Sequence, residues 1–191
     1  MRDILRLGGI LAAFALVAGA PLAFVSIKTM PIIIENKLRA ESEARAEVLP
    51  GMAGGFEIKG EGSGFTYWIG YSDIAKSEPG GYVFTAEGKG YSSTIAIMVG
   101  VDVNGAITGV KILFQQETPG LGVRIEEIRH GEKDPWFTRQ FKGKTASDAI
   151  IVTKDGGDID AITGATISSR AVSSAVKRGL TELMGKTGGS R

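Results

Sequence analysis

Hydroxyl-bearing side chains gather in residues 160–169, which read Asp-Ala-Ile-Thr-Gly-Ala-Thr-Ile-Ser-Ser and directly precede a helix-forming pattern. The first turn of a helix has backbone N–H groups without partners, and the helix dipole adds about half a positive charge, so this end attracts anions. Gly164 lets a ligand approach the backbone closely. A phosphate would therefore be well placed at this segment. Hydroxyls are common before helices, however, so the residues alone favour the interpretation that Thr163, Thr166 and the serines only cap the helix.

A second candidate for ligand binding is the loop of residues 117–122, which reads Glu-Thr-Pro-Gly-Leu-Gly. Its Pro-Gly pair makes a rigid turn that offers backbone amides and the carboxylate of Glu117. An ordinary connecting loop is the alternative for this stretch.

The composition excludes several other kinds of chemistry. The chain has no cysteine, so it has no disulfides, no Fe–S cluster held by thiolates and no lipoprotein cysteine. Its one histidine, His130, lies in a polar stretch typical of the surface. Glu117 and Asp160 do not make a credible acid–base pair, and neither a catalytic triad nor metal-ligand spacing is present. Beyond residue 27 the basic and acidic side chains number 20 each, which gives no basic patch for nucleic acid.

The hydroxyl-rich segment must be positioned by the helix that follows it. Apolar residues recur there at steps of three and four, which predicts one apolar stripe that packs on a sheet. Ser168 and Ser169 are expected to be the N-caps of this helix. The stripe consists of Ala171, Val172, Ala175, Val176, Gly179, Leu180 and Leu183.

The middle of the chain predicts antiparallel strands. Apolar residues alternate with others in residues 65–71, 95–103 and 110–114, and residues 82–86 are a further candidate. Asn104-Gly105, between two of these runs, is a strong hairpin signal because both residues accept a positive φ.

Three shorter stretches complete the expected domain. Residues 51–64 are Gly-rich and predict a connecting loop, residues 135–141 a short helix that begins with Pro, and residues 150–153 a brief strand. Together these elements indicate the α+β class, with an antiparallel sheet packed by helices.

The N-terminal part predicts a membrane anchor. Residues 7–27 form an uncharged run of 21 residues, and a helix of that length crosses the hydrocarbon core of about 30 Å. A cleaved signal peptide is the alternative, but apolar residues continue past the small residues 18–20, and Pro21 would adjoin the cut. We expect an anchor over residues 1–30, a membrane-proximal helix over 31–50, a domain over 51–186 and a tail over 187–191.

The two loops together resemble a known family. Asp160, Thr163, Gly164, Ala165 and Thr166 match a flavinylation signature of Asp, two residues, Ser or Thr, Gly, Ala, Thr. Residues 117–122 look like the same family's Glu-Thr-Pro-Gly-Leu-Gly loop. The family is the FMN-binding domain shared by the G subunit of the Rnf ion-pumping electron-transport complex and the C subunit of the sodium-pumping NADH:quinone oxidoreductase. The resemblance covers roughly residues 80–184.

This resemblance implies a cofactor and its attachment. Thr166 would bear FMN through a phosphoester bond made by a dedicated flavin transferase, and Asp160 would belong to the sequence that the transferase reads. No catalytic residue and no metal are expected. The residues expected to line the flavin site are Thr163, Gly164, Ala165, Ile167, Ser168, Ser169, Glu117, Thr118, Gly120, Leu121 and Gly122.

The resemblance also implies a function. The chain would relay electrons beside other membrane and peripheral subunits of an Rnf-type complex that couples ferredoxin and NAD chemistry to Na⁺ or H⁺ movement. It would sit in the bacterial cytoplasmic (inner) membrane, and Arg2 and Arg6 before the span favour a domain on the extracytoplasmic side. The alternative is a membrane-anchored flavin-binding sensor or structural module. A free-standing reductase that uses NAD(P)H is disfavoured because no Gly-rich dinucleotide fingerprint follows a strand.

Overall fold

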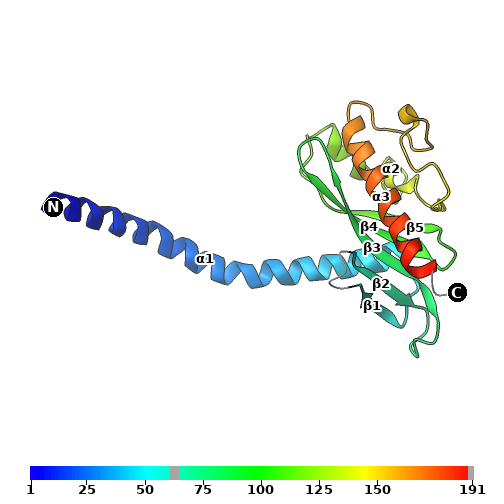
Figure 1. The fold of residues 1–191 in the computed structure, drawn as a ribbon, viewed down its shortest axis with the longest axis horizontal. Coiled ribbons are helices and arrows are strands. Elements are labelled where there is room, and N and C mark those ends of the chain that lie inside the picture. The colour runs from blue at the N-terminus through cyan, green and yellow to red at the C-terminus, as the bar shows by residue number, and fades with distance from the viewer. Residues whose placement is uncertain (61–64, 189–191) are drawn as a thin grey trace. The chain divides into compact units, whose positions relative to one another are not determined.

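The computed structural model of the chain describes residues 1–60 and 65–188. The chain divides into two compact units, Met1–Ser42 and Glu43–Arg191. Its elements are α1 (Arg2–Val48), β1 (Gly55–Lys59), β2 (Tyr67–Tyr71), β3 (Pro79–Lys89), β4 (Thr94–Asp102), β5 (Ile107–Phe114), the 3₁₀ helix η1 (Gly122–Glu126), α2 (Trp136–Arg139), the 3₁₀ helix η2 (Thr153–Asp155) and α3 (Thr166–Thr187) (Figure 1).

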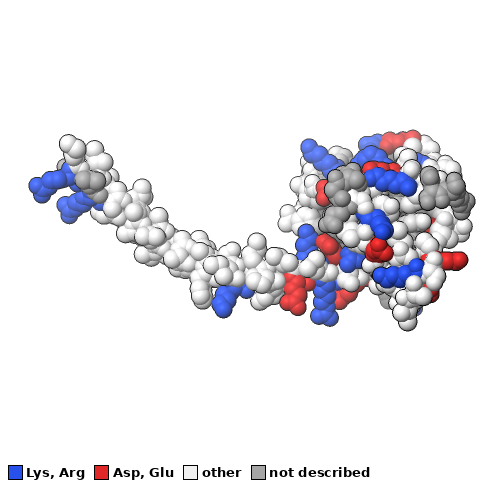
Figure 2. Space-filling model, turned by 60° about the horizontal axis from the view of Figure 1, so that its bottom comes forward, with Lys and Arg blue, Asp and Glu red and all other residues white. Residues whose placement is uncertain are grey.

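The first unit is the greater part of α1, a helix of 47 residues that contains Pro21 and Pro31. An interior proline costs a water-exposed helix about 3 kcal/mol, whereas membrane helices tolerate it. The most apolar stretch of α1 is long enough to cross a membrane, and none of it is buried. Figure 2 shows this stretch without charged atoms, in contrast to the mixed charges on the domain. An exposed apolar helix of this kind fits a membrane anchor.

The second unit is built on a five-stranded antiparallel meander in the order β1-β2-β3-β4-β5. Strand β4, which lies between β3 and β5, is buried on both faces. Its residues Ile95, Ile97, Val99 and Val101 contribute to one core cluster, and Met98 between them contributes to the other. The alternation that predicted these strands is therefore confirmed.

Strand β1 corrects the prediction that residues 51–64 form only a loop. Residues 55–59 pair with β2, from Gly55 opposite Tyr71 to Lys59 opposite Tyr67. The stretch offers only Phe56 and Ile58 as alternating apolar residues among its glycines, too few to reveal a strand. Residues 61–64 of that loop lie outside the described part of the chain.

The predicted hairpin between β4 and β5 is confirmed, but its turn uses one left-handed residue. Only Gly105 has a positive φ, 85°, and Asn104 does not. The carboxylate of Asp102 accepts hydrogen bonds from the backbone N–H of Asn104 at 2.8 Å and of Ala106 at 2.9 Å. Because Asp102 itself organises the turn, Val103 leaves the strand and only one left-handed residue is needed.

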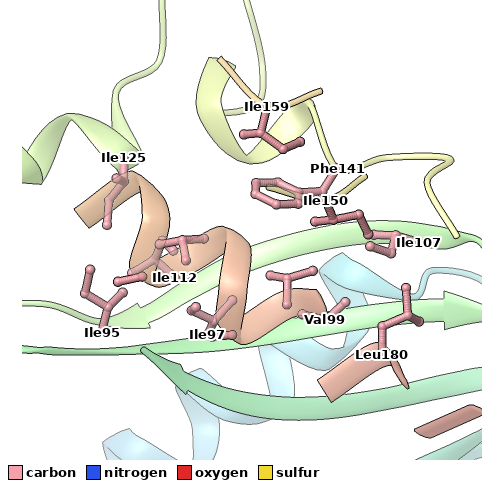
Figure 3. Close-up of a cluster of buried hydrophobic side chains, with 14 of the residues drawn as sticks. Ile95, Ile97, Val99, Ile107, Ile112, Ile125, Phe141, Ile150, Ile159 and Leu180 are labelled. Atoms are coloured by element: carbon pink, nitrogen blue, oxygen red, sulfur yellow. The ribbon is translucent and has the colours of Figure 1, made fainter. Parts of the chain in front are cut away.

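Helix α3 packs along one face of the sheet, as its apolar stripe predicted (Figure 1). A Cβ atom at Gly179 would lie 2.2 Å from Cε2 of Phe84, so this glycine lets the helix pack tightly against β3. Residues of η1 and of the segments after α2 close the far side of the same cluster, as Figure 3 shows for Ile125, Phe141, Ile150 and Ile159 around the strand residues. Helix α3 is thereby fixed to the sheet.

Two further predictions have mixed outcomes. The short helix after Pro135 is confirmed as α2, with Phe137 and Phe141 fully buried. The brief strand expected at residues 150–153 is wrong, because Val152 forms only one isolated parallel bridge, to Ile159.

The opposite face of the sheet carries a smaller cluster. Ala44, Val48 and Leu49, at the end of α1 and just after it, are buried with Val83 and Met98 of the sheet. Thr108 of β5 donates its hydroxyl to the carbonyl of Val48. The last turn of α1 is thus part of the domain.

Candidate functional site

The segment of residues 160–166 forms a tight turn at the start of α3. The backbone N–H of Ala165 donates to the carbonyl of Ile162 at 2.9 Å, and Gly164 adopts a positive φ of 81°. Ile162 and Ala165 are buried, whereas Thr163 and Gly164 are exposed. The side chain of Leu121 lies closest to Gly164 from outside, since a Cβ there would be 3.0 Å from its Cδ2. The turn therefore offers its backbone to a ligand.

The expected N-caps Ser168 and Ser169 are wrong. Helix α3 begins at Thr166, and its N-cap residue Ala165 makes no side-chain hydrogen bond to it. Ser169 instead fastens the turn from inside, because its hydroxyl accepts the N–H of Ile162 and donates to the carbonyl of Ala165, both at 3.0 Å.

The uncapped start of α3 has free backbone donors. The first N–H of the helix that reaches a carbonyl is that of Ser169, which donates to Ala165 at 3.0 Å. Across residues 1–60 and 65–188, the N–H groups of Thr166, Ile167 and Ser168 find no acceptor. Three N–H groups beside the hydroxyl of Thr166, together with the helix dipole, form a donor set that suits a phosphate.

Glu117 is a buried centre of hydrogen bonds beside this turn. Its side chain is 5 % exposed. Oε1 accepts the N–H of Ser92 and of Ser93, and Oε2 accepts the N–H of Tyr91, at 2.9–3.0 Å. Oε2 also accepts the hydroxyl of Ser168 at 2.5 Å. One carboxylate therefore ties the loop after β3 to the first turn of α3.

The charge on Glu117 is stabilised by these donors. Burial raises the pKa of its carboxyl, but the hydrogen bonds from Ser168 and from the backbone of residues 91–93 outweigh burial and hold the pKa below its usual value. The sequence predicted that Glu117 would line the flavin site. The structure places both of its oxygens in contacts with the protein. Glu117 therefore holds the residues around the site in place.

The rest of the 117–122 loop keeps this arrangement compact. A Cβ atom at Gly122 would lie 2.6 Å from Cβ of Glu117 and 2.8 Å from the hydroxyl oxygen of Ser168, so only glycine fits. Gly120 has a positive φ of 75° and open space around it. The hydroxyl of Thr118 lies 3.3 Å from that of Ser92.

Two exposed apolar side chains adjoin this polar backbone. Leu121 is 44 % exposed, and Ile167 of α3 is 48 % exposed. Both belong to the set of residues that the sequence predicted for the flavin site. The site thus has an apolar border.

A lysine that the sequence did not reveal reaches Thr166. The ammonium of Lys154 donates to Oγ1 of Thr166 at 3.2 Å. Lys154 belongs to η2, and the neighbouring Asp155 forms a two-bond ion pair with Arg170 of α3, at 2.6 and 2.7 Å. No local pattern in the sequence indicates the contact, because Lys154 and Thr166 lie 12 positions apart.

The side chain of Gln140 holds the backbone of Asp160 through two hydrogen bonds. Its N–H donates to Oε1 of Gln140 at 2.7 Å, and its carbonyl accepts from Nε2 of Gln140 at 3.2 Å. Residues 160–163 and Gln140 border a cleft of about 400 Å³ that Arg124, Arg129, Arg139 and Trp136 also line. The guanidinium of Arg129 lies 4.0 Å from the centre of the Trp136 ring. The structure thus separates Asp160, on the cleft side, from Thr166.

Most of the sequence-predicted residues therefore meet at the start of α3. The structure brings together residues 163–169 with Glu117, Leu121 and Gly122, and it leaves Asp160 exposed beside the cleft. Groups of three or more His, Cys, Asp or Glu residues that could hold a metal ion are absent from the described residues.

Comparison with known proteins agrees with this geometry. Residues 90–181 match the family described as FMN-binding domain. The chain is 33 % identical over 191 residues to the G subunit of the Na⁺-translocating ferredoxin:NAD⁺ oxidoreductase complex of Acetobacterium woodii, in a match that covers 91 % of this chain and 88 % of that protein. It is 48 % identical over 93 residues to the G subunit of the ion-translocating oxidoreductase complex of Salmonella typhi, where the match spans 47 % of this chain and 43 % of the relative.

Solved structures agree with the fold. The crystal structure of Shewanella oneidensis NqrC matches with a TM-score of 0.51 and 26 % identity, over 66 % of this chain and 62 % of that one. The predicted α+β class, with one apolar N-terminal helix before an antiparallel sheet domain, is confirmed. The chain therefore belongs to the family formed by the G subunits of Rnf-type ion-translocating oxidoreductase complexes, and it is a membrane-anchored protein with an FMN-binding domain.

Proposed function

We propose that this chain relays electrons within a membrane ion-translocating oxidoreductase and that FMN is bonded covalently to Oγ1 of Thr166. One observation carries the proposal. The hydroxyl of Thr166 lies at the uncapped start of α3, beside three free N–H groups and the ammonium of Lys154, inside the segment that matches the FMN-binding family.

The surroundings of Thr166 fit FMN. Phosphate is matched by the N–H groups and by Lys154, and Gly164 leaves the backbone open. The exposed side chains of Leu121 and Ile167 offer apolar contacts to a flat ring. FMN supplies the redox chemistry when it is bound, and the protein supplies position and electrostatics. An electron relay of this kind needs no acid, base or nucleophile of its own.

A covalent bond suits a carrier outside the membrane plane, because loss of the cofactor during turnover would stop electron flow. We assign the neighbouring electron donors and acceptors to other subunits of an Rnf-type complex. We place the domain on the extracytoplasmic side of the bacterial inner membrane, because Arg2 and Arg6 precede the span. A flavin transferase would make the bond, and the exposed Asp160 would belong to what it reads.

Substitution of Thr166 tests this proposal. The full chain is made in cells with and without the transferase, and denaturing gels are viewed under ultraviolet light. We expect a fluorescent band for wild type and for Thr166→Ser with the transferase, and complete loss of the band for Thr166→Ala. Thr181→Ala is the matched control, because it removes an exposed hydroxyl near the far end of α3 and should leave the band in place.

Mass spectrometry locates the bond. Trypsin cuts after Lys154 and Arg170, so one peptide of residues 155–170 carries both Thr163 and Thr166. The wild-type peptide should gain the mass of FMN less one water, at Thr166. An unmodified peptide from cells that make the transferase would overturn the covalent proposal. Flavin-bearing protein that purifies without partner subunits from its native membrane would point instead to a sensor.

A further inference from the structure

Lys154 is a charged side chain that the family resemblance did not single out. Its ammonium lies 3.2 Å from Oγ1 of Thr166. Within residues 1–60 and 65–188, no carboxylate lies within ion-pair distance of Lys154. A lysine with no acidic partner that is aimed at a hydroxyl oxygen is placed to meet an anion attached to that oxygen.

The position of Lys154 is enforced by its neighbours. Asp155 is the nearest carboxylate in sequence, and both of its oxygens bind the guanidinium of Arg170. Arg170 lies one turn after Thr166 on α3, so this ion pair fastens η2 to the same helix turn that presents the hydroxyl. The pair therefore occupies the acid that could compete for Lys154 and also holds Lys154 over Thr166.

We propose that Lys154 is the phosphate-binding side chain of this site, and that its ammonium is the counter-charge of the phosphoester formed on Thr166. This inference rests on the proposed function. The ester leaves one negative charge beside the start of α3. An ammonium has three donors, so Lys154 can turn from Oγ1 to a phosphoryl oxygen next to it without moving its backbone. Lys154 supplies a full charge, whereas the helix start supplies about half of one.

Thermal unfolding of the modified and unmodified forms tests this role. The full chain in detergent is prepared with and without the transferase, the loaded fraction is read from intact mass, and Tm is measured by calorimetry. The quantity of interest is the change in Tm that modification causes. We expect this difference, the Tm of the modified form minus that of the unmodified form, to be roughly 2–4 °C lower in Lys154→Gln than in wild type. The difference should shrink in high salt, because exposed charges are screened.

Two further variants separate charge from structure. Lys154→Arg keeps the charge and should retain most of the wild-type response to modification. Lys142→Gln removes one exposed lysine from a different cleft, near the end of α1 and β5, and should behave as wild type. If modification changes Tm equally in wild type and Lys154→Gln, the inference about Lys154 is overturned while the proposed function stands. If wild-type Thr166 carries no flavin, both fail together.

Discussion

The two faces of the sheet are built differently. The face under α3 carries a large core of buried aromatic and branched side chains, and the candidate site lies at the start of that helix. Within residues 1–60 and 65–188, the cluster on the opposite face has five buried members, three of them from Ala44 to Leu49, with partly buried side chains around them. One face therefore gives the site a rigid base, and the other face receives the last turn of α1. We expect changes on the two faces to affect stability and cofactor loading separately.

The largest expected effect tests whether the α3 face is the main source of stability. Phe84 is fully buried beside Gly179, and Phe84→Ala should lower the free energy of unfolding by about 3–5 kcal/mol. Phe56 is the matched aromatic on the other face, where it is partly buried, and Phe56→Ala should cost roughly 1–2 kcal/mol. Urea unfolding followed by circular dichroism measures both. Equal losses would contradict the difference between the two faces.

A smaller effect is expected at Glu117. Glu117→Gln replaces an oxygen that accepts N–H groups with an NH₂ that cannot, so buried donors lose their partner. We expect a loss of roughly 2–3 kcal/mol at neutral pH. Because the folded-state pKa of Glu117 is lowered, its stabilisation is full above the unfolded pKa of about 4.3 and disappears as the pH falls through the folded pKa.

The pH dependence separates the charge of Glu117 from its shape. Unfolding free energies of wild type and Glu117→Gln, measured from about pH 7 down to about pH 3, should converge in acid. A gap that stays constant over this range would show that the charge is irrelevant. Glu126→Gln is a suitable control, since its carboxylate is exposed and accepts one bond, from Gln115.

The smallest expected effect compares one glycine on each face. A Cβ at Gly122 would meet Glu117 and Ser168, and a Cβ at Gly100 would lie 2.2 Å from the carbonyl oxygen of Val48. Either change to Ala should cost roughly 1–2 kcal/mol through overpacking. Only Gly122→Ala should also lower the fraction of flavin-bearing protein, because only it displaces the first turn of α3. Equal loading of the two variants, read from in-gel fluorescence, would show that the two faces do not differ in their effect on flavin attachment.

The regular elements could be predicted from the sequence because each depends on local periodicity. The apolar stripe from Ala171 to Leu183 and the alternation in β4 are confirmed. Strand β1 could not be predicted, because its two apolar residues are too few to indicate a strand. Its pairing with β2 is what makes it one. The start of α3 was expected three or four residues late for a similar reason. Ser168 and Ser169 are typical cap residues, but burial and tertiary partners recruit them into the first turn.

The candidate site was predictable as a set of residues but not as a set of contacts. The motif and the loop of residues 117–122 pointed to the start of α3. The hydrogen bonds of Glu117 join residues about 25 and 51 positions away, a relation that no local pattern encodes. Lys154 was missed because its link to Thr166 depends on the ion pair between Asp155 and Arg170.

The two hydrogen bonds between Gln140 and the backbone of Asp160 have a consequence for the order of events during biogenesis. Residues 20 positions apart meet only when α2 and the turn before α3 are both in place. A modifying enzyme that recognises Asp160 in this geometry would therefore find its substrate only among chains that have completed the domain. Attachment of the flavin would then be confined to folded chains, and misfolded copies would stay colourless.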